Sequence, residues 1–366
     1  MQAVIGVDPH KHVLSAVALD ERGGLLGRWH GEASNRGTEA LRSWAAERAP
    51  GAAWAIEGSN RLGRHLALAL LDDGADVRDV CPTRTADRRR RRPGRGKSDA
   101  VDAEAIAREL QAHADLPRAF KGAAEGRPNP RREELAVLVR ARRQLVDRHR
   151  RLLNEAEALL GELPAGLTER LPSGQKVQPR LAAAARVRRT GEPLTDLRLE
   201  LLRAKAREER VLAADCAALK QRVADVLKHL GTSLPTLCGL GPLGAAELLA
   251  EVGDPRRFRS ADAFASYTGT APIPASSAEV DGHPVRHRLS RFGNRRLNAV
   301  LYGMAIVRLR VHPETQAYVA RLFAAGKTKR DALRILKRRL ACLVWRAMVR
   351  EVVPGPGEGT PVSGAP

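Results

Sequence analysis

The sequence of 366 residues carries 63 lysines and arginines against 42 aspartates and glutamates, a formal net charge of +21. This length exceeds what one hydrophobic core usually serves, so we expect two domains or more. The arginines occur in clusters, and the four cysteines form no C-x-x-C pair. No basic amphipathic stretch has an aromatic-rich face, and no apolar stretch is long enough to span a bilayer. These features favour nucleic acid over a membrane as the partner, in a cytoplasmic, nucleoid-associated protein.

The first 82 residues predict a mixed α/β layer fold with helices packed on a sheet. The expected elements in chain order are strands at 3–8, 12–20 and 25–33, a helix at 37–49, a strand at 52–58, a helix at 61–71 and a strand at 75–82. The second and third strands meet at the turn ERGG and form a hairpin. Two strands end on an acid, Asp8 and Glu57, at an edge of the sheet where sites form.

A strongly basic stretch then leads into a helix. Proline and glycine interrupt the chain until Ser98, which is a good N-cap for a helix over the following residues. Asp99 and Asp102 lie three apart on one face of its first turn. Either the helix dipole stabilises these acids, or they share a divalent ion such as Mg²⁺ beside arginines that hold phosphates. The residues expected to bind nucleic acid here, together called the basic loop, are Arg88, Arg89, Arg90, Arg91, Arg92, Arg95 and Lys97.

An acid on the first strand, one on the fourth and two on a later helix form the arrangement of ribonuclease-H-like nucleases. Four carboxylates can hold one or two Mg²⁺ ions at a scissile phosphate. The segments VIGVDPHK, WAIEGSN and GKSDAVDAEAIA resemble the RuvC-like N-terminal domain of insertion sequence 110 family transposases, which are related to Piv-type invertases. The resemblance implies a catalytic, metal-binding acid tetrad of Asp8, Glu57, Asp99 and Asp102.

Two long helices are expected in the middle of the chain. Residues 113–130 are rich in proline, glycine and alanine and predict a linker. Leucines near the heptad step predict helices at 130–163 and 195–230, separated by a stretch broken by prolines and glycines. The two helices predict an antiparallel coiled-coil arm. Its arginines form either a solvated face or an RNA or DNA contact, and the scarcity of compensating acids favours the contact.

The stretch LPTLCGLGPLGAAELLAEVGD, residues 234–254, predicts a helix-hairpin-helix. Gly239 and Gly241 would let backbone N–H groups approach a phosphate without reading sequence, although an ordinary glycine-rich turn would have the same composition. Beyond it the chain is expected to be mainly helical, with helices at 294–310, 313–325 and 328–351 and a disordered tail.

Residues 260–296 begin as a helix and open into a polar loop rich in arginine. The runs A-S-Y-x-G-x-x-P, S-S and R-x-x-S-R-x-G-N-R-R-L resemble the C-terminal transposase domain of the same family. The resemblance implies a nucleophilic serine, matched by Ser277 with Ser276 one step away. Ala278 stands where the family often has glycine, which leaves the register open by one residue. The arginines of this region expected to bind nucleic acid are Arg288, Arg291, Arg295 and Arg296.

We therefore expect a DNA recombinase that mobilises its own insertion sequence. Its expected parts are a RuvC-like domain (1–112), a linker and arm (113–230), a C-terminal transposase domain (231–352) and a tail (353–366). The resemblance implies strand exchange through a transient serine–DNA bond, guided by a structured noncoding RNA. Pairing of donor and target DNA predicts a dimer or tetramer. The alternatives are a Mg²⁺-dependent Holliday-junction-type nuclease acting by hydrolysis and a non-enzymatic DNA-binding protein.

Overall fold

The computed structural model describes residues 2–80, 99–113, 116–122, 129–274, 287–289 and 293–352. The chain forms two compact units. The first comprises residues 1–130 and 252–263, and the second comprises residues 131–251 and 264–366. No helix in the described part of the chain is long and apolar enough to cross a membrane.

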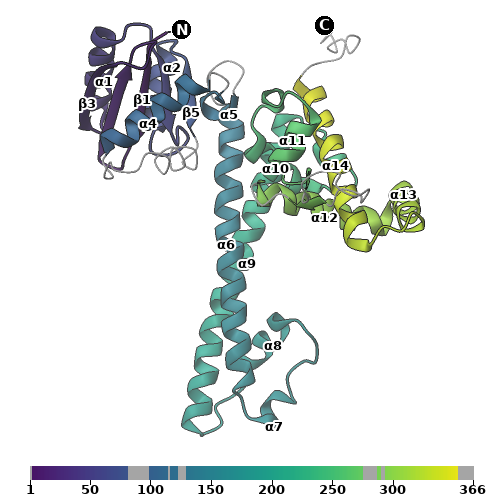
Figure 1. Cartoon of the computed structure of the whole chain (residues 1–366). Coiled ribbons are helices and arrows are strands. Elements are labelled where there is room, and N and C mark those ends of the chain that lie inside the picture. Colours follow the sequence, from purple (N-terminus) through teal and green to yellow (C-terminus); the bar gives the residue numbers. More distant parts are fainter. Residues whose placement is uncertain are drawn as a thin grey trace, which may run out of the picture. The chain divides into compact units, whose positions relative to one another are not determined.

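A five-stranded mixed sheet in the order β3-β2-β1-β4-β5 forms the centre of the first unit (Figure 1). β2 (Val13–Leu19) pairs antiparallel with both β1 (Val4–Pro9) and β3 (Leu25–Glu32). β4 (Ala53–Glu57) pairs parallel with both β1 and β5 (Val77–Val80). β2 therefore runs opposite to the other four strands of this sheet. This is the ribonuclease-H-like topology, and the predicted α/β fold is confirmed.

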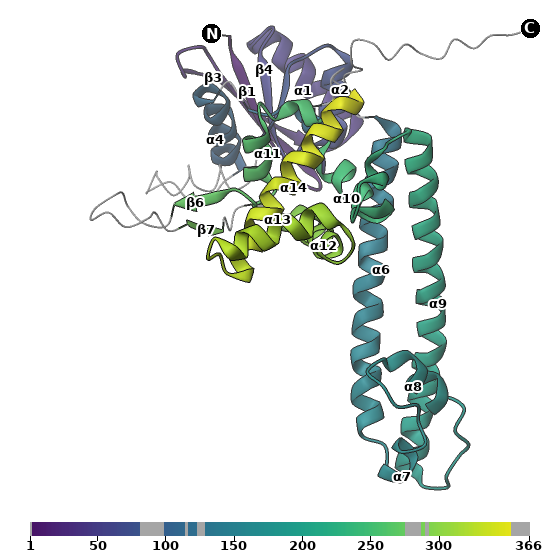
Figure 2. The same cartoon turned by 90° about the vertical axis from the view of Figure 1, so that its right-hand side faces the viewer.

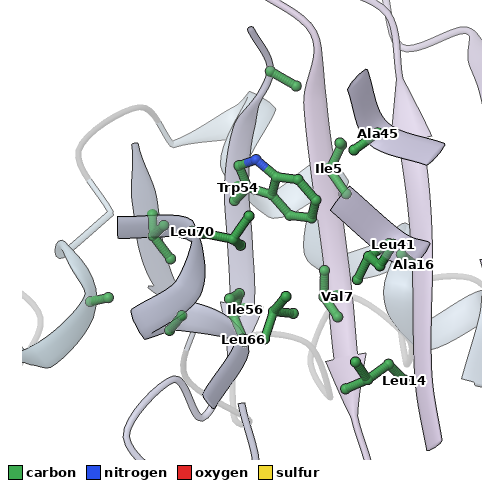
Figure 3. Packing of buried hydrophobic residues seen from close by; sticks show 14 of the residues in the cluster. Ile5, Val7, Leu14, Ala16, Leu41, Ala45, Trp54, Ile56, Leu66 and Leu70 are labelled. Atoms are coloured by element: carbon green, nitrogen blue, oxygen red, sulfur yellow. The ribbon is translucent and has the colours of Figure 1, made fainter. Parts of the chain in front are cut away.

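Helices cover both faces of the sheet. α1 (Asn35–Arg48) and α2 (Arg64–Asp72) pack on one face, and α4 (Asp99–Ala112) packs on the other. Because side chains alternate along a strand, each strand contributes to both layers. The layer under α1 and α2 includes Ile5, Val7, Leu14, Trp54, Ile56, Leu41 and Leu66 (Figure 3). The layer under α4 includes Val4, Val17, Leu19, Ala53, Ala55, Ala103, Ile106 and Ala107.

Gly6 allows α4 to lie directly on β1. A Cβ atom built on Gly6 would lie 2.3 Å from the carbonyl oxygen of Ala103 and 2.3 Å from the backbone nitrogen of Ala107. Both atoms belong to the helix backbone, so no side chain can turn aside to make room. The close approach therefore requires glycine at this position.

Part of the predicted linker belongs to the first unit. Leu116, Ala119 and Phe120 are buried against the sheet layers, and Arg118 forms a β-bridge with Arg78. The short helix α5 (Ala119–Gly122) lies in this stretch. The proline- and glycine-rich composition that predicted a linker did not show these three apolar contacts.

Two long helices, α6 (Pro130–Gly161) and α9 (Pro193–Leu230), lie side by side and antiparallel (Figures 1 and 2). Arg148 pairs with Glu208 and Arg198 pairs with Glu162, so ascending numbers on one helix meet descending numbers on the other. At the end of this pair, α7 (Ala165–Thr168) and α8 (Val177–Ala184) connect the two helices. Leu181 of α8 is buried with Leu160 and Leu199 of the long helices.

Downstream of α9 the described chain is mainly helical, as predicted. The helical elements are η1 (Leu234–Thr236), α10 (Gly241–Val252), η2 (Pro255–Arg257), α11 (Ala261–Tyr267), α12 (Arg295–Val311), α13 (Pro313–Ala324) and α14 (Lys329–Val352). Between α11 and α12, β6 (Pro272–Pro274) pairs antiparallel with β7 (His287–Leu289).

Candidate metal centre and nucleic-acid-binding elements

The two strand acids of the tetrad lie next to each other on the α4 side of the sheet. Asp8 alternates with Gly6, the residue that touches α4, and so shares its face of β1. Glu57 in the same way follows Ala55, which is buried under α4. The parallel register that pairs Val7 with Ile56 places the two acids side by side where β1 and β4 end.

The two helix acids stand over the strand acids. Asp99 and Asp102 occupy the first turn of α4, as predicted, and Asp102 directly precedes Ala103, the residue held against Gly6. Asp102 is buried, whereas the side chain of Asp99 is 45% exposed. The contact at Gly6 therefore places the first turn of α4 beside the end of β1 that bears Asp8.

The charges of the four acids act on one another at Asp8. Burial raises the pKa of Asp8 above its ordinary value of 3.8. His10 lowers this pKa, and the negative charges of Glu57, Asp102 and Asp99 raise it again. Several carboxylates gathered in a partly buried place repel one another, and a divalent cation relieves that repulsion. Carboxylate oxygens are the donors that a hard divalent ion prefers.

His10 lies between one strand acid, Asp8, and one helix acid, Asp99. Its Nε2 lies 3.3 Å from Asp8 Oδ2 and 3.5 Å from Asp99 Oδ1. The three side chains offer ligand atoms that all lie within 4.8 Å of one another. We did not predict this histidine from the sequence, although one signal was available: it stands two residues after Asp8, just beyond the end of β1.

The turn that follows Glu57 is fixed by an acid on the neighbouring strand. Gly58 has a φ of +65°, which favours glycine. Ser59 is fully buried, and its N–H and hydroxyl donate to Asp79 Oδ1 at 2.9 and 2.5 Å. These bonds tie the end of β4 to β5 and so hold Glu57 in place.

Several predicted site residues lie outside the described residues. They include the whole basic loop (Arg88, Arg89, Arg90, Arg91, Arg92, Arg95 and Lys97), the N-cap Ser98, and Ser276, Ser277 and Arg291. The structure does describe what flanks the predicted nucleophile. Pro272 pairs with Leu289 and Pro274 pairs with His287, so β6 and β7 pair on either side of residues 275–286, which we call the serine loop.

Arg296, one of the arginines expected to bind nucleic acid, forms an ion pair inside the second unit. Its guanidinium donates to Glu251 Oε1 at 2.6 Å, and Asn294 donates to Glu251 Oε2 at 3.0 Å. Asn294 is also the N-cap of α12. Arg295 is exposed, and Arg288 lies on β7 opposite Ile273. A nucleic acid would therefore have to compete with Glu251 for Arg296.

The two glycines of the predicted helix-hairpin-helix differ in their surroundings. A Cβ atom on Gly239 would lie 2.7 Å from the carbonyl oxygen of Met304 in α12, so this glycine permits close packing. Gly241, with a φ of +59°, begins α10 and has open space where a Cβ atom would lie. Of the two, Gly241 is the position that a phosphate could approach.

The sheet order and the acids on its α4 side define the first unit as a RuvC-like domain of the ribonuclease-H-like class. Comparison with family models gives a more particular result. The transposase family model of the insertion sequence 110 DEDD type matches residues 5–163, and the model "Transposase IS116/IS110/IS902 family" matches residues 231–320. The chain belongs to this family of insertion-sequence transposases, which makes it an enzyme of DNA recombination.

Individual relatives agree with this family. A 44.8 kDa protein of insertion element IS116 from Streptomyces clavuligerus is 27% identical over 95% of this chain and 94% of the relative. The pilin gene-inverting protein of Moraxella bovis is 31% identical over 35% of this chain and 39% of its own length. Among solved structures, Thermus thermophilus RuvC aligns with 31% of this chain and 95% of its own, with 16% identity and a TM-score of 0.25.

Proposed function

We propose that this transposase cuts and rejoins DNA at the ends of its insertion sequence, and that the acid tetrad holds the Mg²⁺ ion that the cutting requires. The convergence of Asp8, Glu57, Asp99 and Asp102 on the α4 side of the sheet carries the proposal. A bound Mg²⁺ supplies electrostatic stabilisation of a phosphate under attack.

The exposure of the acids indicates how the substrate reaches them. Asp8 and Asp102 are buried and rigidly placed by β1 and α4, whereas Asp99 and Glu57 are more exposed. We infer that Asp8 and Asp102 anchor the ion and that a DNA phosphate approaches from the side of Asp99 and Glu57. Placing the ligands on a strand and a helix holds their geometry more accurately than a loop would.

The basic loop supports a nucleic-acid substrate next to this centre. It ends at Lys97, two residues before Asp99, so in the sequence its positive charges directly precede the helix that carries two of the acids. Arginine and lysine side chains neutralise phosphates along a nucleic acid and set its position without reading its bases. The net charge of +21 is consistent with DNA and with a structured noncoding guide RNA as partners.

For the strand exchange itself we propose Ser277 as the nucleophile, following the family resemblance. Its oxygen would attack the phosphorus and form a serine–phosphate ester, while the departing sugar oxygen takes a proton. The reverse attack by a sugar hydroxyl would restore the diester and release the serine, so rejoining needs no ATP. β6 and β7, which flank the serine loop in the sequence, pair with each other. Exchange between donor and target also requires several active sites, which supports a dimer or tetramer.

Trapping a covalent protein–DNA species tests this mechanism. Labelled DNA carrying the ends of the element is incubated with the protein and Mg²⁺, and the mixture is then denatured and separated by size. We expect a labelled adduct with the wild type and with Ser276→Ala, and neither adduct nor cleavage with Ser277→Ala. An exchange of the two variants' results would move the nucleophile by one residue. Cleavage by Ser277→Ala at the wild-type rate, without any adduct, would show a nuclease that uses water.

A further inference from the structure

His10 occupies a place that neither the tetrad nor the fold requires a histidine to fill. Its backbone is fixed, because its N–H donates to the carbonyl of Val13 at 2.8 Å in the turn between β1 and β2. Pro9 precedes it, and the proline ring fixes the backbone φ angle at that position. Gly6 and Asp8 share the face of β1 that lies under α4, and His10 follows just beyond the end of the strand with its Nε2 near Asp8 and Asp99. The imidazole is thereby directed to the start of α4.

The spacing of the ligand atoms matches adjacent ligands of a six-coordinate ion. Ligands about 2.1 Å from an octahedral ion lie about 3.0 Å apart when they are neighbours. His10 Nε2 lies 3.3 Å from an oxygen of Asp8 and 3.5 Å from an oxygen of Asp99, only slightly farther. The same nitrogen is close to both a strand acid and a helix acid, which is where an ion shared by β1 and α4 would lie.

We propose that His10 is a direct ligand of the divalent ion held by the tetrad, and that its nitrogen makes the centre bind Mn²⁺ more tightly than Mg²⁺. This inference rests on the proposed metal centre and adds a ligand and a metal preference to it. Mg²⁺ is held mainly by carboxylates and water, whereas transition ions also accept imidazole nitrogen. The reaction can still use Mg²⁺, because the carboxylates remain available to it.

The simplest competing explanation is that His10 only pairs with the two carboxylates. A histidine of this kind would fix the geometry of Asp8 and Asp99 without contacting the ion. Removal of such a histidine would weaken the binding of Mg²⁺ and of Mn²⁺ by the same factor. The loss of a nitrogen ligand would instead weaken the binding of Mn²⁺ more than that of Mg²⁺. The two roles also differ in whether bound Mn²⁺ has nitrogen next to it.

Electron spin echo envelope modulation of bound Mn²⁺ distinguishes them, because it detects the nitrogen of a coordinated imidazole. The full-length protein is stripped of metal, loaded with Mn²⁺ and measured beside the folded variant His10→Ala. We expect nitrogen modulation in the wild type and none in His10→Ala. We also expect the Mn²⁺ dissociation constant to rise about tenfold or more, and the Mg²⁺ constant, measured by competition, to rise less.

Two further variants complete the test. His12→Ala removes an exposed histidine two residues away and should keep both the modulation and the affinity. His10→Asp restores an oxygen ligand and should recover Mg²⁺ binding without nitrogen modulation. Mn²⁺ bound by the wild type without nitrogen modulation, or an equal loss of both ions in His10→Ala, would overturn the role of His10 and leave the tetrad intact. A wild type that binds no Mn²⁺ and no Mg²⁺ would overturn the proposed centre itself.

Discussion

Gly6→Ala should damage the metal centre although Gly6 is not a ligand. The new Cβ atom would lie 2.3 Å from two backbone atoms of α4 and 2.8 Å from the Cα atom of Ala107. Ordinary contacts between carbon atoms begin near about 3.5 Å, so α4 would have to move by about 1 Å. Overpacking of this kind costs about 1–3 kcal/mol of the free energy of unfolding. Because Asp99 and Asp102 move with the helix, a displacement of about 1 Å can cost about a hundredfold in cleavage.

Urea denaturation and Mn²⁺ titration of Gly6→Ala measure the two effects separately. The matched control is Gly303→Ala in α12, where a Cβ atom meets nothing within 4 Å. That substitution should leave metal affinity unchanged and raise stability by up to about 1 kcal/mol through helix propensity. Gly6→Ala with wild-type stability and wild-type metal affinity would refute the reasoning that this contact places the helix acids.

Burial raises the pKa of Asp8 above 3.8, so the folded protein holds this proton more tightly than the unfolded chain, and stability is lost as the pH rises through the raised pKa. Metal-free Asp8→Asn should therefore have a higher urea midpoint than the metal-free wild type at pH 7, and this difference should shrink as the pH falls towards 3.8. A difference in midpoint that stays constant over this range would contradict the raised pKa of Asp8. Ser59→Ala removes the hydroxyl that donates to Asp79 and should cost about 1–3 kcal/mol in the same measurement; an unchanged midpoint would show that this bond contributes nothing. Replacing Arg88–Arg92 with glutamine should flatten the dependence of DNA affinity on salt by about 0.9 logarithmic units for each phosphate that these arginines neutralise, and an unchanged slope would mean that the side chains are only solvated.

The sheet and the helices on it could be predicted because their sequence periods are unambiguous. Ile5 and Val7 alternate with Val4 and Gly6. The first pair is buried in the layer under α1 and α2, and the second pair lies under α4. The strand acids could be placed for the same reason, since alternation puts Asp8 on the Gly6 face. The close contact of α4 with β1 follows from a glycine, but no pattern in the sequence says which helix meets that glycine.

His10, the packed part of the predicted linker and the pairing of Arg296 were not predictable in this way. His10 matters through a distance to Asp99, which depends on the tertiary contact at Gly6. Phe120 lies between prolines and glycines that obscure a short buried segment. Arg296 looks like a nucleic-acid contact in the sequence, but Glu251, 45 residues away, accepts its hydrogen bond. Long-range partners of charged side chains leave no local signal.

The central claim is that the tetrad holds the ion with which the transposase cuts DNA. The most direct test is to measure Mg²⁺ affinity and the cleavage rate on the same preparation of Asp102→Asn, which removes one negative ligand and keeps the shape of the side chain. Glu109→Gln is the matched control, because Glu109 is an equally buried acid of α4 that pairs with His113 outside the centre. We predict that Asp102→Asn loses Mg²⁺ affinity and cleavage together, by about tenfold or more, while Glu109→Gln retains both. Cleavage by Asp102→Asn at the wild-type rate would contradict the assignment.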